Sequence, residues 1–149
     1  EVCIPPNCNV PLGPFSGLNS KYKFVWRSIR LGLEGGMPIY RGFALKGSTI
    51  FIPYTQYEGE GIWNLRTTWK QSPSFTHSAK GGYGAQLEAS VVYYIYPAFT
   101  MGAGYRYWYI KSGKGDDITY FSDGTAGITQ FNEAINERQG VFLDISYMF

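Results

Sequence analysis

A few side chains in this sequence have the types and spacings needed for acid–base catalysis or metal binding. His77 is the single histidine; a role as a general base is conceivable, although a histidine at the rim of a fold explains it more simply. Glu58 and Glu60 would share one face of a strand. They could act as an acidic pair, but two solvated surface charges explain them equally well. Asp116–Asp117 and Asp123–Gly124 offer oxygen ligands for Ca²⁺, but their spacing fits turns better than a calcium loop. We therefore predict no catalytic residue, no metal and no resident cofactor.

The two cysteines, Cys3 and Cys8, are separated by four residues that include two prolines and an asparagine. This spacing predicts a small loop closed by a disulfide in an oxidising compartment, with two free thiols as the alternative. A zinc site would need further Cys or His ligands nearby, and the sequence has none. We expect residues 1–20 to form an N-terminal segment or an extracellular loop, and residues 21–149 to form strands and their loops.

Composition narrows the fold class. The chain has 149 residues, of which 18% are aromatic and 16% charged, and this excludes a disordered tail or a coiled coil. No apolar run approaches the roughly 18 residues of a transmembrane helix. The net charge of +2, without a basic cluster, argues against a nucleic-acid partner. An all-β chain remains, either soluble or membrane-spanning.

Alternation of apolar and polar residues with period two is the clearest structural signal, as in the run from Tyr83 to Ile95. It predicts five long strands at about residues 21–36, 42–58, 75–96, 98–112 and 134–149. Short turns, near 38–41 and 96–98, alternate with long polar segments at 59–74 and 113–133. Outer-membrane barrels have short periplasmic turns and long outer loops. The sequence therefore predicts a transmembrane antiparallel up-and-down β-barrel in a bacterial outer membrane.

The polar side of these strands combines glycines with balanced charges. A soluble barrel or sandwich is the alternative, but its solvent face would carry more Lys, Glu and Thr and less Gly. We expect the polar side to line a narrow lumen filled by an ionic network of three cations and three anions: Arg30, Glu34, Lys46, Glu88, Arg106 and Asp144.

An odd number of strands leaves two edges, which lipid does not tolerate. Either the chain is the C-terminal part of a larger barrel, or a second copy or another chain completes the sheet. The order of the strands, with Ile29 to Gly35, Gly81 to Gly84, Gly102 to Arg106 and the aromatic-terminated last strand, resembles the C-terminal half of the omptins. Omptins are ten-stranded outer-membrane barrels that include surface proteases, so the resemblance implies that five strands are half of such a barrel.

The resemblance also bears on activity. Omptin proteases carry an Asp-x-His element at the top of the second strand of this half, and the corresponding stretch from Tyr54 to Trp63 has no histidine. We therefore expect an omptin-like surface protein with a non-enzymatic structural, adhesion or binding role carried by the loops 59–74 and 113–133. An omptin-like endopeptidase and a narrow channel are the alternatives.

A location in the outer membrane implies lipopolysaccharide and the barrel assembly machinery as binding partners. Omptins hold lipopolysaccharide with outward basic residues, and Lys80, Arg66 and Lys70 are the candidates in this chain. The last strand ends in aromatic residues, and we expect Tyr147 and Phe149 to act as its signal to the barrel assembly machinery.

Overall fold

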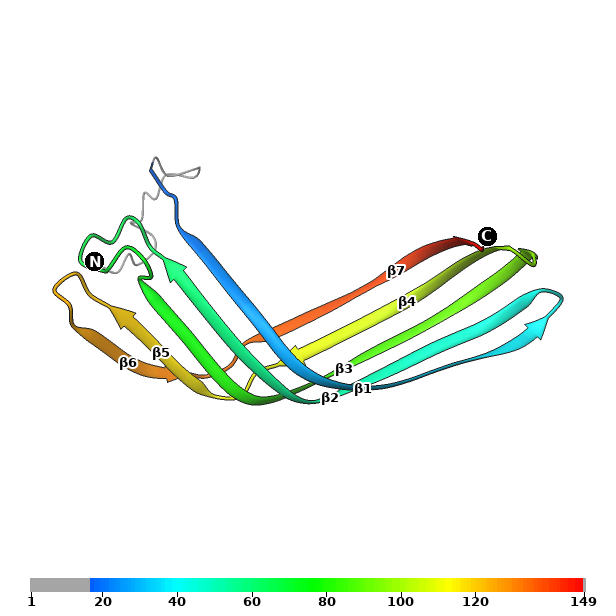
Figure 1. The fold of residues 1–149 in the computed structure, drawn as a ribbon, viewed down its shortest axis with the longest axis horizontal. Coiled ribbons are helices and arrows are strands. Elements are labelled where there is room, and N and C mark those ends of the chain that lie inside the picture. The colour runs from blue at the N-terminus through cyan, green and yellow to red at the C-terminus, as the bar shows by residue number, and fades with distance from the viewer. Residues whose placement is uncertain (1–16, 149) are drawn as a thin grey trace, which may run out of the picture.

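A computed structural model describes residues 17–148, so Cys3, Cys8 and Phe149 lie outside the described part. Its strands are β1 (Lys21–Tyr40), β2 (Phe43–Ile62), β3 (Phe75–Tyr96), β4 (Phe99–Lys111), β5 (Gly115–Tyr120), β6 (Ala126–Phe131) and β7 (Ile135–Tyr147). They form one antiparallel sheet in the order β1-β2-β3-β4-β7, with β5 paired to β3 and β6 (Figure 1). The all-β antiparallel fold is confirmed.

The segment 113–133 is not a loop, and that prediction is wrong. β3 pairs with β4 from Tyr83 to Tyr96 and with β5 from Phe75 to Ala79, so β5 continues the line of β4. β6 then pairs with β5 and leads back into the line of β7. The physical reason is the length of β3: its outer residues extend past β4, and their backbone groups need a hydrogen-bonding partner.

The predicted strands are also shorter than the observed ones at two ends. β1 runs to Tyr40 rather than to residue 36, and β2 runs to Ile62 rather than to residue 58. The turn between them is only Arg41–Gly42, both with positive φ, as a type I′ hairpin turn requires. A tight turn of this kind lets the two strands pair almost to their ends.

The pairing of the strands is irregular at one height, where the sheet bends sharply (Figure 1). The β1–β2 register shifts between Ile29 and Leu31, and the β2–β3 register shifts around Thr55. Gly81 adds a residue to β3 with φ +82°, and the breaks between β4 and β5 and between β6 and β7 lie alongside. Bulges bend strands in this way, so five aligned irregularities fold the whole sheet.

Polar side chains satisfy the backbone at the bend. Thr55 Oγ1 donates to the Lys111 carbonyl at 2.9 Å, and Ser112 Oγ accepts from the Ala134 amide at 2.8 Å. Thr55 and Ser112 are fully buried. The bend divides the sheet into a turn half (31–40, 43–52, 83–96, 99–111 and 135–147) and a loop half (21–29, 55–80 and 115–131).

The sheet is a single layer with little core. The accessible surface of the chain is 11142 Å², whereas a compact protein of 16.8 kDa exposes about 7,700 Å². In residues 17–148 the buried apolar side chains are Ile52, Tyr57, Ala79, Val92 and Ile110. No helix within this range is long and apolar enough to cross a membrane. A sheet with so little core leaves most of its apolar side chains to an environment other than its own interior.

Candidate functional site

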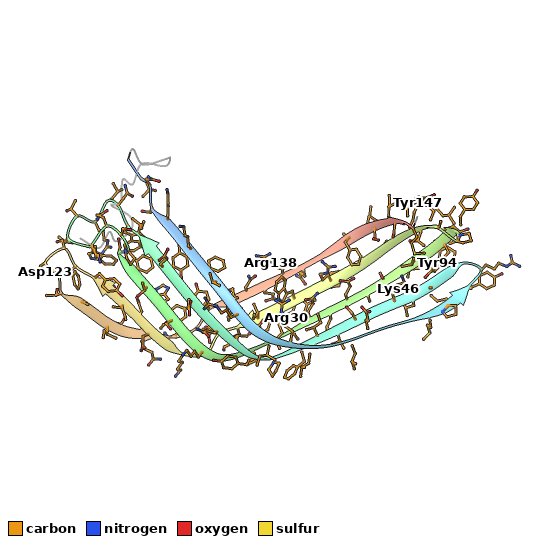
Figure 2. The ribbon with its side chains drawn as sticks, viewed as in Figure 1. Arg30, Lys46, Tyr94, Asp123, Arg138 and Tyr147 are labelled. Carbon is orange, nitrogen blue, oxygen red and sulfur yellow. The ribbon has the colours of Figure 1, made fainter. Side chains whose placement is uncertain are left out.

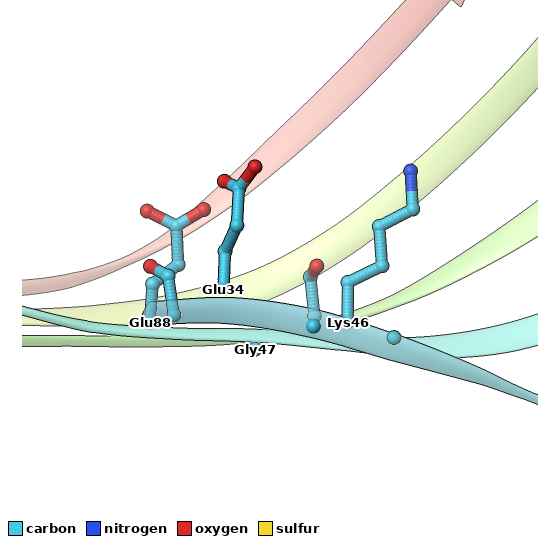
Figure 3. A pocket seen from close by; sticks show the side chains of 8 residues that line it. Glu34, Lys46, Gly47 and Glu88 are labelled. Atoms are coloured by element: carbon cyan, nitrogen blue, oxygen red, sulfur yellow. The ribbon is translucent and has the colours of Figure 1, made fainter. Parts of the chain in front are cut away.

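The inside of the bend, here called the concave face, carries the charged side chains of the turn half. The β-ladders place the six predicted network residues on this one face, and Figure 3 shows Glu34, Lys46 and Glu88 projecting to the same side. These three line a hollow of about 440 Å³ together with Gly35, Gly36, Gly47, Ser48 and Ser90. Of the three glycines, Gly36 has the parity of the concave face, and its missing side chain leaves room beside Lys46.

The charges of this face do not form a continuous network. Arg106 Nε lies 2.6 Å from Glu88 Oε2, and its guanidinium packs over the Phe142 ring at 5.2 Å. Lys46 Nζ lies 5.9 Å from the Tyr94 ring centroid, inside the bend (Figure 2). Among the described residues, no ion pair joins Glu34 or Asp144 to a cation. The face therefore combines one close ion pair with charges left to solvent.

Arg30 and Arg138 belong to the same face, although Arg138 was not among the residues predicted from the sequence. Both guanidiniums pack on Trp108, with Cζ at 5.3 Å and 5.7 Å from the ring (Figure 2). Arg138 has the same parity as Asp144 on the last strand, so the alternation was a usable signal for its face. Its meeting with Arg30 was not predictable, because β1 and β7 are opposite edges of the sheet.

The opposite, convex face of the turn half is apolar. Val141 is 88% exposed and Leu143 is 86% exposed. The same face carries other exposed apolar side chains from all five strands, among them Leu31, Leu33, Leu45, Phe51, Leu87, Val91, Met101 and Ile145. In water a continuous apolar surface of this size would be an aggregation hazard, so the face requires an apolar environment.

The loop half reverses this polarity. β1 has no extra residue at the bend, so Tyr22, Phe24 and Trp26 share the concave face with Arg30; Arg30 Nε donates to Ser28 Oγ at 3.2 Å, also on that face. The pairing adds Tyr57, Phe75, His77, Asp117 and Phe131. The convex face carries Lys23, Arg27, Glu58, Glu60, Ser78 and Lys80 instead. Here the aromatic residues turn inward and the charges turn outward.

His77 stands at the centre of the aromatic cluster. Its Nε2 lies 3.4 Å from Asp117 Oδ1, and its Nδ1 lies 2.7 Å from the Tyr22 hydroxyl, which is 2.5 Å from the Tyr57 hydroxyl. With the Nε2 proton toward the carboxylate, Nδ1 accepts from Tyr22 and Tyr22 accepts from Tyr57. The ring also stacks on Phe131 at 4.7 Å. The result is a row of four polar groups from four strands, surrounded by aromatic rings.

Burial determines the protonation states of His77 and Tyr22. It lowers the pKa of His77, while the nearby Asp117 carboxylate opposes the shift. Burial, followed by the hydrogen bond with Tyr57, raises the pKa of Tyr22. Both groups are therefore neutral at physiological pH. Nδ1 of His77 is held by the Tyr22 hydroxyl, whereas Asp117 Oδ1, 3.4 Å from Nε2, is buried and has no hydrogen-bond partner in the described part of the chain.

Only one member of the predicted acidic pair, Glu58, forms an ion pair within the described residues. Arg27 Nη1 lies 2.6 Å from Glu58 Oε2, and this hydrogen bond holds the pKa of the Glu58 carboxyl below its usual value. Glu60, opposite Lys23 in the β1–β2 ladder, has no ion pair among the described residues. At the tip of the β5–β6 hairpin, Asp123 Oδ1 accepts from the amide and the hydroxyl of Thr125. That geometry is turn chemistry, and no group of metal ligands occurs in residues 17–148.

The three basic residues predicted to contact lipopolysaccharide do not form one cluster. Arg66 packs over both Trp63 and Trp69, at 4.6 Å and 4.9 Å, in the loop 63–74. In the same loop, Lys70 lies 5.7 Å from the Tyr120 ring. Lys80 lies on β3 opposite Gln56, close to the bend. The outer loop thus holds two of the cations on aromatic rings, and the sheet holds the third.

Comparison with known proteins gives a family. A family model described as "Pom: Protochlamydia outer membrane protein" matches residues 9–149. Searches of curated proteins and of solved structures gave no match. The match spans all seven strands, including both faces of the turn half. The chain therefore belongs to the Pom family and is a protein of the bacterial outer membrane.

Proposed function

We propose that this protein is a transmembrane β-barrel whose turn half crosses the outer membrane and whose concave face lines a water-filled pore for small solutes. The observation that carries the proposal is the opposite polarity of the two faces of the turn half. Outer-membrane barrels alternate apolar residues outward with polar residues inward. The convex face then meets lipid, and the charged concave face meets water.

Strand length supports this placement. Aromatic residues occupy both ends of the convex face in the turn half, with Tyr93 near the turns and Tyr83 near the bend on β3. Ten residues along a strand span about 33 Å, and a tilt of about 40° reduces this to about 25 Å. This height equals the apolar band of such barrels, which aromatic girdles flank on either side.

Closure of the barrel needs further strands. β1 at one edge and the β6–β7 line at the other both run from the loop end to the turn end. A second copy of this chain would place two strands of the same direction at each seam. An odd number of additional strands gives antiparallel pairs at both seams, and five of them give an even total of ten. We propose this omptin-like strand number, with the other half supplied by further strands of the protein or by another chain.

A cysteine accessibility experiment tests the pore. In a Cys3→Ser, Cys8→Ser background, Ser90→Cys places a thiol on the concave face and Val91→Cys places one on the convex face, one residue apart on β3. With the full-length protein in planar bilayers, we expect stepwise ion conductance. A water-soluble methanethiosulfonate reagent should reduce the current of Ser90→Cys and leave Val91→Cys unchanged. Absence of conductance, or equal reaction of the two thiols, would contradict the proposal.

A non-enzymatic surface role of the outer loops is a second candidate. The observation in its favour is Arg66, held on Trp63 and Trp69 in the loop 63–74, with Lys70 in the same loop. Both cations suit the phosphates of lipopolysaccharide, with Lys80 as a third contact nearer the bend. An Arg66→Gln, Lys70→Gln variant should bind purified lipopolysaccharide more weakly and conduct normally; unchanged binding would count against this role. With the Nε2 proton toward Asp117, the basic nitrogen of His77 is Nδ1, and the Tyr22 hydroxyl already binds it, which favours the non-enzymatic role over an endopeptidase.

The last strand supports a proposal about assembly. β7 ends at Tyr147, whose parity is that of the lipid-facing Ile145, and Phe149 continues that parity in the sequence. We propose that this aromatic end is the segment that the barrel assembly machinery recognises. Tyr147→Ser should lower the amount of folded protein in the outer membrane, and an unchanged amount would contradict the proposal.

A further inference from the structure

We propose that Arg30 and Arg138, held on the indole of Trp108, form a binding site for a small oxyanion, with inorganic phosphate as the simplest ligand. The site lies on the concave face next to the bend. Its role in selecting solutes rests on the pore proposed above, whereas binding itself does not depend on conductance.

The geometry brings two cations together from opposite edges of the sheet. Trp108 lies on β4 and is the direct partner of Arg138 on β7, whereas Arg30 reaches it from β1, across β2 and β3. Both guanidinium carbons lie within cation–π range of the same ring, at 5.3 Å and 5.7 Å. Figure 2 shows both side chains inside the bend. The indole thus gathers two positive charges at one height of the concave face.

Each arginine is anchored in the same way. Arg30 Nε donates to Ser28 Oγ and Arg138 Nε donates to Asn136 Oδ1, both at 3.2 Å and both two residues back on the same strand. Within residues 17–148 neither guanidinium has a carboxylate partner, and no hydrogen bond uses their terminal nitrogens. A guanidinium that lies on an aromatic ring keeps its N–H groups at the edge, where they match two oxygens of an oxyanion.

The other charges of the face leave this position positive. Glu88 is occupied by Arg106 at 2.6 Å. Glu34 is four residues from Arg30 along β1, or about 13 Å at the rise of a strand. Asp144 is six residues from Arg138 along β7, or about 20 Å. Two cations on one ring, neither paired with a carboxylate, repel each other, and a bound anion offsets that repulsion.

An unused donor strengthens the assignment. Trp108 Nε1 is buried and has no hydrogen-bond partner in the described part of the chain. Buried N–H groups are rarely left in that state, and an acceptor bound between the indole and the arginines would satisfy it. Lys46, by contrast, lines the hollow beside two carboxylates, Glu34 and Glu88, although no ion pair joins it to either among the described residues.

The test measures phosphate binding and ion selectivity on the same full-length protein. By calorimetry in detergent, wild-type protein should bind inorganic phosphate, and an Arg30→Gln, Arg138→Gln variant should bind it at least about tenfold more weakly. Arg27→Gln removes a cation from the convex face of the loop half and should leave phosphate binding unchanged. An Arg30→Lys, Arg138→Lys variant keeps the charge but loses the planar donors, so its affinity should be intermediate. Strand content by circular dichroism shows that each variant is folded.

In planar bilayers under a KCl gradient, the reversal potential should show a preference for chloride that the double glutamine variant loses, and phosphate should block the wild-type current. Phosphate binding without conductance would support the site and contradict the pore. Conductance without phosphate binding, and with a reversal potential that the double variant does not change, would overturn the site and leave the pore standing.

Discussion

The two halves of the sheet use the same strands with opposite polarity. In the turn half the concave face is charged and the convex face is apolar, whereas in the loop half the aromatic residues are concave and the charges are convex. Tyr57, on the concave face of the loop half, is only 5% exposed, and Leu143, on the convex face of the turn half, is 86% exposed. The difference agrees with the placement proposed above, with lipid around the turn half and water around the loop half.

The two faces of the sheet exchange their polarity at the bend. Gly81 adds one residue to β3, so the odd-numbered residues from Tyr83 onward face the convex side and the odd-numbered residues before Gly81 face the concave side. A single bulge therefore moves His77 and Phe75 inside without any change in the alternation of residue types. The loop half makes its own small core from the aromatic side chains that this shift turns inward.

The largest predicted difference between the halves comes from a charge on the convex face. Leu87 in the turn half and Val25 in the loop half are both 51% exposed. Leu87→Arg should lower the free energy of unfolding in lipid vesicles by about 2–4 kcal/mol, because the arginine enters the apolar band. Val25→Arg should change it by no more than about 0.5 kcal/mol, because that face is already charged and wet.

Denaturant titration of the two variants in vesicles, followed by tryptophan fluorescence, measures the difference. Equal losses of stability would remove the distinction between a lipid-facing and a water-facing convex surface.

The two halves also differ in how tightly side chains pack against their glycines. A Cβ added to Gly61, on the concave face of the loop half, would overlap the Phe75 ring, which lies across the glycine. Gly61→Ala should therefore cost about 1–3 kcal/mol. A Cβ added to Gly35, on the convex face of the turn half, meets no atom within 4 Å, so Gly35→Ala should be neutral or stabilise by up to about 1 kcal/mol.

Thermal unfolding of both variants checks this, with a Gly61→Ala, Phe75→Leu double variant as the control. Recovery of stability in the double variant would locate the cost in the overlap with the ring. A loss that persists would mean that the glycine is required for another reason.

The sequence predicts the turn half better than the loop half for a physical reason. Between Tyr83 and Ile95 one face is apolar and the other is mostly polar, so residue types alternate and the strand is evident. Past the bend both faces carry aromatic or polar side chains. Ser112, Gly113 and Lys114 interrupt the line of β4, and the polar segment 113–133 was predicted to be a loop because its apolar run is too short to cross a membrane as a strand.

The residues of the candidate sites can likewise be predicted only in part from the sequence. Parity along a single strand is enough to place Arg30, Glu88 and Arg106 on the polar face. The chain of Tyr22, His77 and Asp117 requires the register of three strands, and that register depends on bulges that no local pattern specifies. The meeting of Arg30 with Trp108 depends further on how the sheet curls. Side chains that meet across several strands are the part of the site that a sequence alone does not reveal.

The smallest predicted difference between the halves is their response to pH. Burial holds the pKa of His77 below its ordinary value of 6.5, so the folded loop half favours the neutral imidazole. The unfolded segment binds a proton at higher pH than the folded one. The stabilisation is therefore complete above about pH 6.5 and decreases as the pH falls through the unfolded value toward the folded one.

Three groups surround the ring and decide how large the response is. Asp117 from β5 favours the charged imidazole and opposes the loss, Tyr22 from β1 stays neutral, and Phe131 from β6 is apolar. Protonation of Nδ1 would also place a donor against the Tyr22 hydroxyl and force that hydroxyl to reverse its hydrogen bonds.

Amide hydrogen exchange between pH 7.5 and 5.5, corrected for intrinsic rates, should show greater opening of β3 from Phe75 to Ala79 and of β5, with no change for β4 and β7. His77→Gln retains a donor and an acceptor but does not titrate, so it should abolish the response. If β4 and β7 opened equally, or if His77→Gln kept the response, the loop half would not be stabilised separately from the membrane-facing half. Restriction of the effect to the strands around His77 would show that the aromatic cluster, and not lipid, holds the loop half together.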